Sequence, residues 1–396
     1  MQIKNGLTFL LVLTHLNGIL QSQKMRCQDQ PTDNINSSVQ GNGDMSLRQE
    51  LQFKLVFHIL YKEENENISD AQIYSQIQVL NNIFADANET DDLILPAAFR
   101  NLKKTAGFHF CLAHVDPDGQ PTTGITRSKI QDLSIACKRE FGKRSIMHRV
   151  LGGVDIWDPA KFINVYVVNR EQCAVLGEAI YPWNANAEED GIILDFRSVG
   201  YSGQAAKNRP FHEGKTLVHE LGHFFGLLHL SGDANNCSGN DFVEDTPPQS
   251  MEYYGCPDFP VSSCTTADMF MNYMSYVDDD CMHFFTKGQV ERMRDQLAVY
   301  RLTLSSEPCS SHENQNLTNL YWTDNGGYWV LSGLAQKEWS AALTLFAVDG
   351  RYLWHSPLAT SVLRVIPQPT EEFASGFFLL RMENETESRM MKLIKY

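Results

Sequence analysis

The chain has little positive charge and no long apolar run. Its 396 residues include 33 Lys and Arg against 48 Asp and Glu, which gives a formal net charge of -15 and a pI near 5.2. Such a chain is a poor partner for nucleic acid or an anionic membrane, and solubility alone explains the acidity. No stretch reaches the ~18 uninterrupted apolar residues of a membrane-spanning helix. We therefore expect neither a nucleic-acid partner nor a membrane span, and the length allows two or three domains.

The N-terminal segment has the pattern of a secretion signal. Lys4 is its positive flank, residues 7–13 form a short apolar core broken by Thr8, and residues 18–23 offer a cleavage region without a clean A-x-A. Residues 24–50 are polar and have little to bury, which is typical of a linker or propeptide. We expect residues 1–23 to be a signal peptide and residues 24–50 a propeptide of an exported protein.

Export decides how the nine cysteines are interpreted. In an oxidising compartment an odd number leaves at least one cysteine outside an intramolecular pair. Four of the nine lie in the loop-rich stretch from Cys237 to Cys281, which disulfides would stiffen.

A metal-binding motif lies in the middle of the chain, at residues 219–229, with the sequence HELGHFFGLLH. On a helix, His219 and His223 leave the same face one turn apart, and Glu220 beside them can reach a water held by a metal. Gly226 lets the helix stop and swings His229 back towards the first two histidines. Three imidazoles with an open fourth position describe a catalytic zinc site. Two histidines at helical spacing are common in ordinary helices, but the added G-x-x-H is the zinc signature of metzincin proteases.

Cys27 stands alone in the polar N-terminal segment. A thiolate is a strong zinc ligand, so Cys27 can occupy the open zinc position and hold an enzyme latent. The alternative is an unpaired or intermolecular cysteine, and its spacing does not separate the two.

Apolar periodicity predicts a mixed sheet with helices packed against it. A nearly continuous apolar run at 53–61 predicts a central strand, and a capping box at Ser69 opens a helix to about residue 87. A second helix is expected at 285–300 with Thr286 near its cap. The further strands are expected at residues 107–115, 162–168, 176–181 and 191–196.

An acidic, irregular segment follows the third histidine. Asp241, Glu244 and Asp245 gather within it, and their oxygens together with backbone carbonyls are the hard ligands that calcium prefers. A solvated acidic loop is the simpler interpretation of such a cluster.

The stretch from about 50 to 309 resembles the pappalysin family of metzincins. Beyond the zinc motif, the supporting segments lie at residues 110–113, 116–119, 124–127, 155–159, 245–247 and 272–282. The resemblance implies an α/β (α+β) metzincin catalytic domain at 51–309, with a mixed twisted sheet, an active-site helix and a loop-rich C-terminal subdomain.

Several residue roles follow from this resemblance. Met274 would be the methionine of the Met-turn below the zinc, and Tyr276 would help to stabilise the reacting carbonyl. Asp280 would lie at the base of the pocket for the residue downstream of the cut, which predicts cleavage before Arg and less often Lys. Cys27 matches the propeptide cysteine of the family, although the residues that follow it differ.

The resemblance also implies a calcium site and two disulfides. The expected calcium ligands are Asp241, the carbonyl of Val243, Asp245 and Thr246. The expected bridges are Cys237–Cys264 and Cys256–Cys281, and the pairing of Cys111, Cys137, Cys173 and Cys309 stays open.

After a polar linker at 310–317, residues 318–396 have short apolar runs separated by turn signals, as expected for a small C-terminal β-sandwich. Its strands are expected at residues 330–331, 343–348, 377–380 and 391–394. This part resembles the sorting domain of type IX secretion cargo, notably at residues 348–351 and 392–395. A carbohydrate- or protein-binding module is the alternative. The sorting interpretation implies secretion machinery as a partner and an extracellular or cell-surface location, reached through the periplasm.

The motif predicts a secreted zinc endopeptidase acting on protein or peptide substrates. Zn²⁺ at His219, His223 and His229 activates a water, and Glu220 takes its proton and passes it to the leaving amine. Zinc and Tyr276 hold the developing oxyanion. A catalytically silent binding or adhesion protein on the same scaffold is the alternative, but it would have no need of Glu220.

Overall fold

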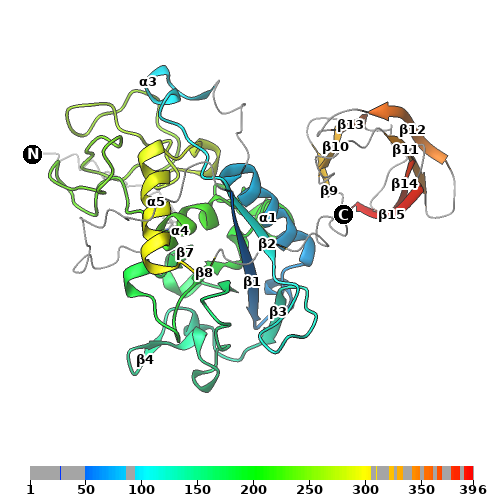
Figure 1. Ribbon diagram of the computed structural model, residues 1–396, viewed down its shortest axis with the longest axis horizontal. Coiled ribbons are helices and arrows are strands. Elements are labelled where there is room, and N and C mark those ends of the chain that lie inside the picture. Colours follow the sequence, from blue (N-terminus) through cyan, green and yellow to red (C-terminus); the bar gives the residue numbers. More distant parts are fainter. Residues whose placement is uncertain are drawn as a thin grey trace, which may run out of the picture.

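The computed structural model describes Cys27, residues 50–85 and 94–304, Cys309 and the backbone of seven C-terminal strands. The expected signal peptide, most of the propeptide and the linker at 310–317 lie outside the described residues. Figure 1 shows the order of the elements along the chain. None of the helices in the described part has the length and hydropathy that a membrane crossing requires.

A mixed sheet forms the centre of the part expected to be the catalytic domain. The strand β1 (Leu51–Tyr61) pairs in parallel with β2 (Phe108–Leu112), β3 (Ile125–Lys129) and β6 (Phe162–Val168). Beyond β6 lie the parallel β8 (Ile192–Asp195) and the antiparallel β7 (Gly177–Ala179) at the sheet edge. Eight of the eleven β1 residues are buried, including all six from Leu55 to Leu60, as the apolar run predicts for a strand covered on both faces. A two-stranded hairpin, β4 (Arg139–Glu140) and β5 (Lys143–Arg144), lies outside this sheet.

The helix α1 (Asp70–Phe84) covers the sheet close to β2. The Ser69 hydroxyl accepts from the Gln72 N–H at 3.2 Å, so Ser69 caps the helix as predicted. The Gln72 amide instead donates to the carbonyls of Phe196 and Val199, which ties α1 to the chain beyond β8. The capping box was therefore only half right, because a tertiary contact uses the glutamine.

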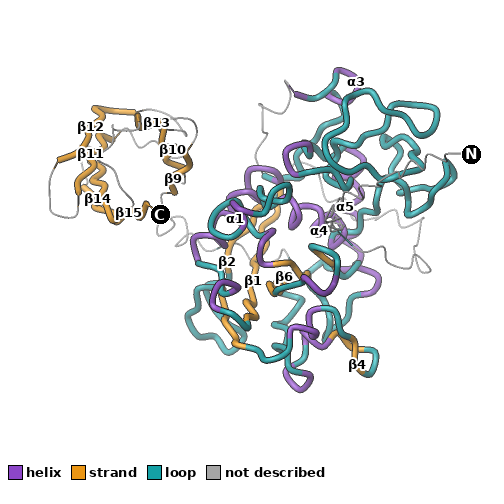
Figure 2. The backbone as a smooth tube through the Cα atoms, turned by 180° about the vertical axis from the view of Figure 1, so that it is seen from behind, coloured by secondary structure: helices purple, strands orange, loops and turns teal. Residues whose placement is uncertain are grey.

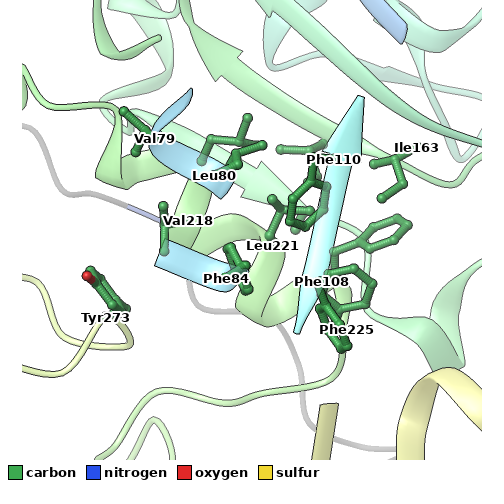
Figure 3. Packing of buried hydrophobic residues seen from close by; sticks show 14 of the residues in the cluster. Val79, Leu80, Phe84, Phe108, Phe110, Ile163, Val218, Leu221, Phe225 and Tyr273 are labelled. Atoms are coloured by element: carbon green, nitrogen blue, oxygen red, sulfur yellow. The ribbon is translucent and has the colours of Figure 1, made fainter. Parts of the chain in front are cut away.

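The short helix α4 (Lys215–Phe224) packs its apolar residues into the same core. Figure 3 shows Leu221 of α4 and Phe225, the residue that follows the helix, beside the aromatic rings of Phe108 and Phe110 on β2. The Phe108 and Phe225 ring centroids are 5.1 Å apart. This packing determines which face of α4 is turned towards the core and which face remains for functional side chains.

The chain between α4 and the helix α5 (Lys287–Tyr300) is almost entirely loop, apart from a 3-10 turn at Asp279–Cys281 (Figure 2). A further short helix, α3 (Ala97–Arg100), precedes β2. The Thr286 hydroxyl accepts from the Gln289 N–H at 3.1 Å and starts α5 with a capping box.

Four disulfides join eight of the nine described cysteines. Cys237–Cys264 and Cys256–Cys281 lie in the loop-rich region, and Cys137–Cys173 and Cys111–Cys309 account for the pairs that the sequence left open. Cys27 is buried and lies outside these four disulfides. Cys111–Cys309 joins β2 to the end of the catalytic part.

The C-terminal strands form two antiparallel sheets, in the orders β13-β10-β9 and β12-β11-β14-β15. The expected strands near 330, 343–348, 377–380 and 391–394 fall in β10, β11, β14 and β15, although residue 348 itself lies outside the described residues, and β9, β12 and β13 were not predicted. The strand bounds are Tyr321–Asp324, Tyr328–Ser332, Ala341–Ala347, Tyr352–Ala359, Arg364–Pro367, Gly376–Glu383 and Ser388–Lys395.

Candidate active site

Three histidines converge at the end of α4. His219 and His223 leave consecutive turns of the helix, and their Nε2 atoms are 3.1 Å apart. His229 returns from the following loop, with its Nε2 atom 3.0 Å from that of His223 and 3.3 Å from that of His219. All three side chains are buried.

Gly226 makes this return possible. Its φ of +93° lies in the left-handed region, and a Cβ there would come within 2.6 Å of the Gln296 side chain. Arg292 on α5 donates to the Gly226 carbonyl at 2.8 Å, so α5 holds the turn in place. A side chain at position 226 would therefore both strain the backbone and push against α5.

The donor atoms of the three histidines fit a zinc ion. The Nδ1 atoms donate to oxygen atoms of Tyr273, Leu227 and Asp233, so the Nε2 atoms carry bare lone pairs that face one another. Burial lowers the pKa of His223 to about 3, so this imidazole is neutral. Zn–N distances of about 2.0–2.1 Å place tetrahedral ligands about 3.3 Å apart. Three lone pairs that face one another at these separations fit a cation between them.

Glu220 lies between this histidine cluster and the edge of the sheet. Its carboxylate is buried against Gly177 on β7, where a Cβ would collide with it. Burial raises the pKa of Glu220 to about 8, and the buried guanidinium of Arg170 and then His229 oppose that rise. A cation on the three imidazoles would also favour the carboxylate form, in which Glu220 can accept a proton.

Met274 and Tyr276 lie on the turn beneath the histidines. The Met274 thioether packs against Gly222 so closely that a Cβ there would collide with the sulfur. The Met274 N–H donates to the Asn272 side chain at 2.9 Å, which fixes the turn. The Tyr276 ring centroid is 4.8 Å from that of His229, and its hydroxyl donates to the Cys27 carbonyl at 3.4 Å.

Cys27 is brought into the site from far away in the sequence. Its thiol and ligand atoms of the three histidines all lie within 4.8 Å of one another. The cysteine is buried, with 3% of its surface exposed. Four potential ligands of one metal ion therefore meet at one point.

Asp280 follows the Met-turn in the sequence, but in the folded chain it lies close to the segment that leads into α4. Its side chain is 52% exposed, with the Arg209 guanidinium 3.6 Å and the His212 ring nitrogen 3.8 Å away. The adjacent Asp279 is buried and accepts from the Glu213 N–H at 2.8 Å. This contact joins the segment that carries Asp280 to the beginning of the active-site helix.

The acidic loop after His229 brings together three of the four expected calcium ligands. The Thr246 hydroxyl is 2.8 Å and 2.9 Å from the two Asp241 carboxylate oxygens and 2.9 Å from the Val243 carbonyl. Burial raises the pKa of Asp241 to about 7, against hydrogen bonds from Thr246 and the Val243 backbone. The Asp245 carboxylate points elsewhere and accepts from the Thr286 hydroxyl at 2.6 Å, at the start of α5.

Asp233 is a site residue that the sequence interpretation missed. It accepts from His229 Nδ1 at 2.5 Å. The available signal was an aspartate four residues after the third histidine, next to a glycine.

The fold and the site together define a zinc-dependent peptidase of the metzincin type.

Comparisons with known proteins give the family. Residues 153–298 match the family described as pregnancy-associated plasma protein-A, the pappalysins. An extracellular metalloprotease of Arthroderma gypseum is 31% identical over 246 residues, covering 60% of this chain and 69% of the relative. One from Coccidioides posadasii is 31% identical over 263 residues, covering 64% and 80%.

Solved structures agree with these relatives. Tannerella forsythia promirolysin matches with a TM-score of 0.60 and 36% identity, over 65% of this chain and 85% of that one. Mature mirolysin in complex with a cleaved peptide matches with a TM-score of 0.56 and 35% identity, over 65% and 98%. The chain belongs to the pappalysin family and is a zinc metalloendopeptidase with a metzincin fold.

Proposed function

We propose that this protein is a secreted, latent endopeptidase that cuts peptide bonds before Arg, and less often before Lys. His219, His223 and His229 hold the zinc, which when bound supplies a Lewis acid and lowers the pKa of the attacking water. The single observation that carries the proposal is the buried carboxylate of Glu220 beside three convergent imidazoles.

Glu220 and Tyr276 do the remaining chemistry. Glu220 accepts the proton of the attacking water and then delivers it to the leaving amine. Its buried position against β7 holds the carboxylate in one place during both transfers. Once Cys27 has left, the Tyr276 hydroxyl can donate to the developing oxyanion of the scissile carbonyl.

Asp280 selects the residue downstream of the cut. An arginine of the chain itself, Arg209, lies 3.6 Å from its carboxylate, which supports the idea that the position attracts a guanidinium. The planar fork of arginine can pair with both carboxylate oxygens, whereas lysine offers a single ammonium. Arginine is therefore the preferred residue.

Cys27 keeps the enzyme latent. Its thiolate takes the position that the attacking water needs. The Tyr276 hydroxyl, which would donate to the oxyanion, instead donates to the Cys27 carbonyl. Removing the segment that carries Cys27 frees both positions at once.

Calcium stabilises the loop at 241–246. The buried Asp241 carboxylate, the Val243 carbonyl and the Thr246 hydroxyl offer hard oxygens around one point, and a buried carboxylate is costly without a cation. The Asp245 carboxylate is not part of this set, because it links the loop to α5 by accepting from the Thr286 hydroxyl and the Gly288 N–H.

Residues 318–396 serve as an export domain that the type IX secretion machinery recognises, and the catalytic domain spans 51–309. The relatives named extracellular metalloproteases support a location outside the cell. The sorting role rests on the sequence resemblance at residues 348–351 and 392–395.

The test of the catalytic assignment is Glu220→Gln, which keeps the size of the side chain and removes its basicity. We expect the variant to keep one zinc per chain and to lose peptide hydrolysis by at least about 10²-fold. Metal content by atomic absorption and cleavage of an arginine-containing peptide measure the two properties. Activity near that of the wild type would rule out Glu220 as the base.

A further inference from the structure

The three zinc-binding imidazoles are supported in two different ways. His219 and His223 stand on α4, where the helix fixes their backbone and backbone carbonyls accept from their Nδ1 atoms at 2.8 Å. His229 stands on the loop beyond Gly226 and has no helix beneath it. Its Nδ1 atom meets a carboxylate, that of Asp233, at 2.5 Å.

The chain is built to place this carboxylate. Asp233 has a φ of +57° and follows Gly232 at +60°, so two successive residues are left-handed. Asparagine and aspartate adopt this conformation more readily than other side chains do. The Asp233 N–H donates to the Ser231 hydroxyl at 3.2 Å, which in turn donates to Glu252 at 2.6 Å. The turn is thus tied to the loop-rich subdomain.

The contact has two effects on His229. An acceptor at Nδ1 holds the ring in the tautomer whose Nε2 lone pair faces the other two histidines. A carboxylate also raises the basicity of the imidazole more than a neutral carbonyl does, and so strengthens its bond to a metal. Asp233 itself is 12% exposed, and His229 1%, so water screens the pair weakly.

We propose that Asp233 is a positioning residue for the zinc site: it orients the loop-borne ligand His229 and slows the loss of the metal. The inference rests on the zinc site of the proposed function and is independent of the substrate preference. In this proposal the Asp233 carboxylate holds His229 in place, as α4 does for His219 and His223.

The experiment compares Asp233→Asn and Asp233→Gly in full-length protein carrying Glu220→Gln, which prevents self-cleavage. Asparagine keeps the shape and tolerates the positive φ, and glycine removes the side chain at a φ that suits it. Asp118→Asn, in an exposed turn, is the control for the lost charge. Zinc release to an excess of a chromogenic chelator gives the dissociation rate.

We expect both Asp233 variants to release zinc about 10–100-fold faster than the parent, with the control unchanged. The melting temperature of the metal-free variants should stay within about 2 °C of the parent, because the contact serves the ligand and not the fold.

Release at the parent rate from either folded variant would overturn the proposal. Failure of both variants to fold would also overturn it, because a residue that only orients a ligand is not required for the fold. A parent protein that takes up no zinc would refute the zinc site itself, which separates that failure from this one.

Discussion

At the scale of single residues, neighbours in the sequence have different tasks because a helix turns about 100° per residue. His219 faces the metal site, while the adjacent Glu220 lies against Gly177 on the edge strand. A base beside the metal ligands, but not among them, can move a proton without giving up coordination. Two neighbouring aspartates differ in the same way. The Asp279 side chain is buried and structural, whereas the Asp280 side chain is half-exposed.

The first prediction at this scale concerns Asp280. Asp280→Asn should lower the preference for Arg over an uncharged residue by about 10-fold or more, because a charged pairing partner is replaced by a neutral one. Product sequencing from a peptide library gives the preference. Asp278→Asn is the matched control, since it removes a neighbouring carboxylate two residues away. An unchanged cleavage profile in Asp280→Asn would reject the role.

At the scale of elements, continuous apolar runs predicted strands correctly, whereas segments of mixed polarity did not. The strand β6 was predicted at 162–168 and observed as Phe162–Val168, because every residue in it is buried. The strand β3 (Ile125–Lys129) was missed. Its five residues are at least partly exposed and carry no apolar alternation, and pairing with β1 alone makes them a strand.

The N-terminal segment gives a prediction about activation. Cys27→Ala should abolish the lag before activity appears in freshly purified full-length protein, because the thiolate no longer competes with water. Continuous cleavage of a fluorogenic peptide measures the lag. A lag as long as that of the wild type would indicate an incidental cysteine.

The processing site follows from the proposed specificity. Arg48 is the single Arg or Lys between Cys27 and Leu51, so self-cleavage before Arg should fall at the Leu47–Arg48 bond. N-terminal sequencing of the product identifies the bond. Arg48→Gln, which leaves Cys27 in place, is the control and should prolong the lag.

The calcium loop gives a prediction about stability. Calcium at 100 times its dissociation constant should add about 2.7 kcal/mol to the free energy of unfolding, or about 5–10 °C in melting temperature. EGTA should remove this gain, and Asp241→Asn should abolish it. Glu244→Gln, at an exposed neighbouring carboxylate, should keep it. A melting temperature that is the same in calcium and in EGTA would count against the site.

At the scale of the whole molecule, Cys309 lies at the end of the expected catalytic domain and is held against the sheet. Its disulfide to Cys111 and the 2.7 Å hydrogen bond from its N–H to Gln52 tie this end to the first two strands. The histidine cluster, the Met-turn and the acidic loop all precede α5. The catalytic part therefore contains its own site and its own closing contacts.

Truncation after residue 312 should therefore leave a folded, zinc-loaded protease with unchanged cleavage of small peptides, while the protein stays in the periplasm of its native host. Peptide cleavage in solution and the amount of protein in the culture medium measure the two effects. Normal export of the truncated chain would remove the sorting role. Lost cleavage of large substrates alone would favour a substrate-binding module.

The sequence by itself determined that His219 and His223 share one face of a helix beside Glu220, and it located the main core strands. Helical spacing places His219 and His223, and burial follows local apolar pattern, so both are properties of short segments. The tertiary structure decided what depends on distant segments. It brought Cys27 to the histidines, paired Cys111 with Cys309 and turned Asp245 towards α5. No local sequence pattern predicts these contacts, because each joins residues that are far apart in the sequence and meet only in the folded chain.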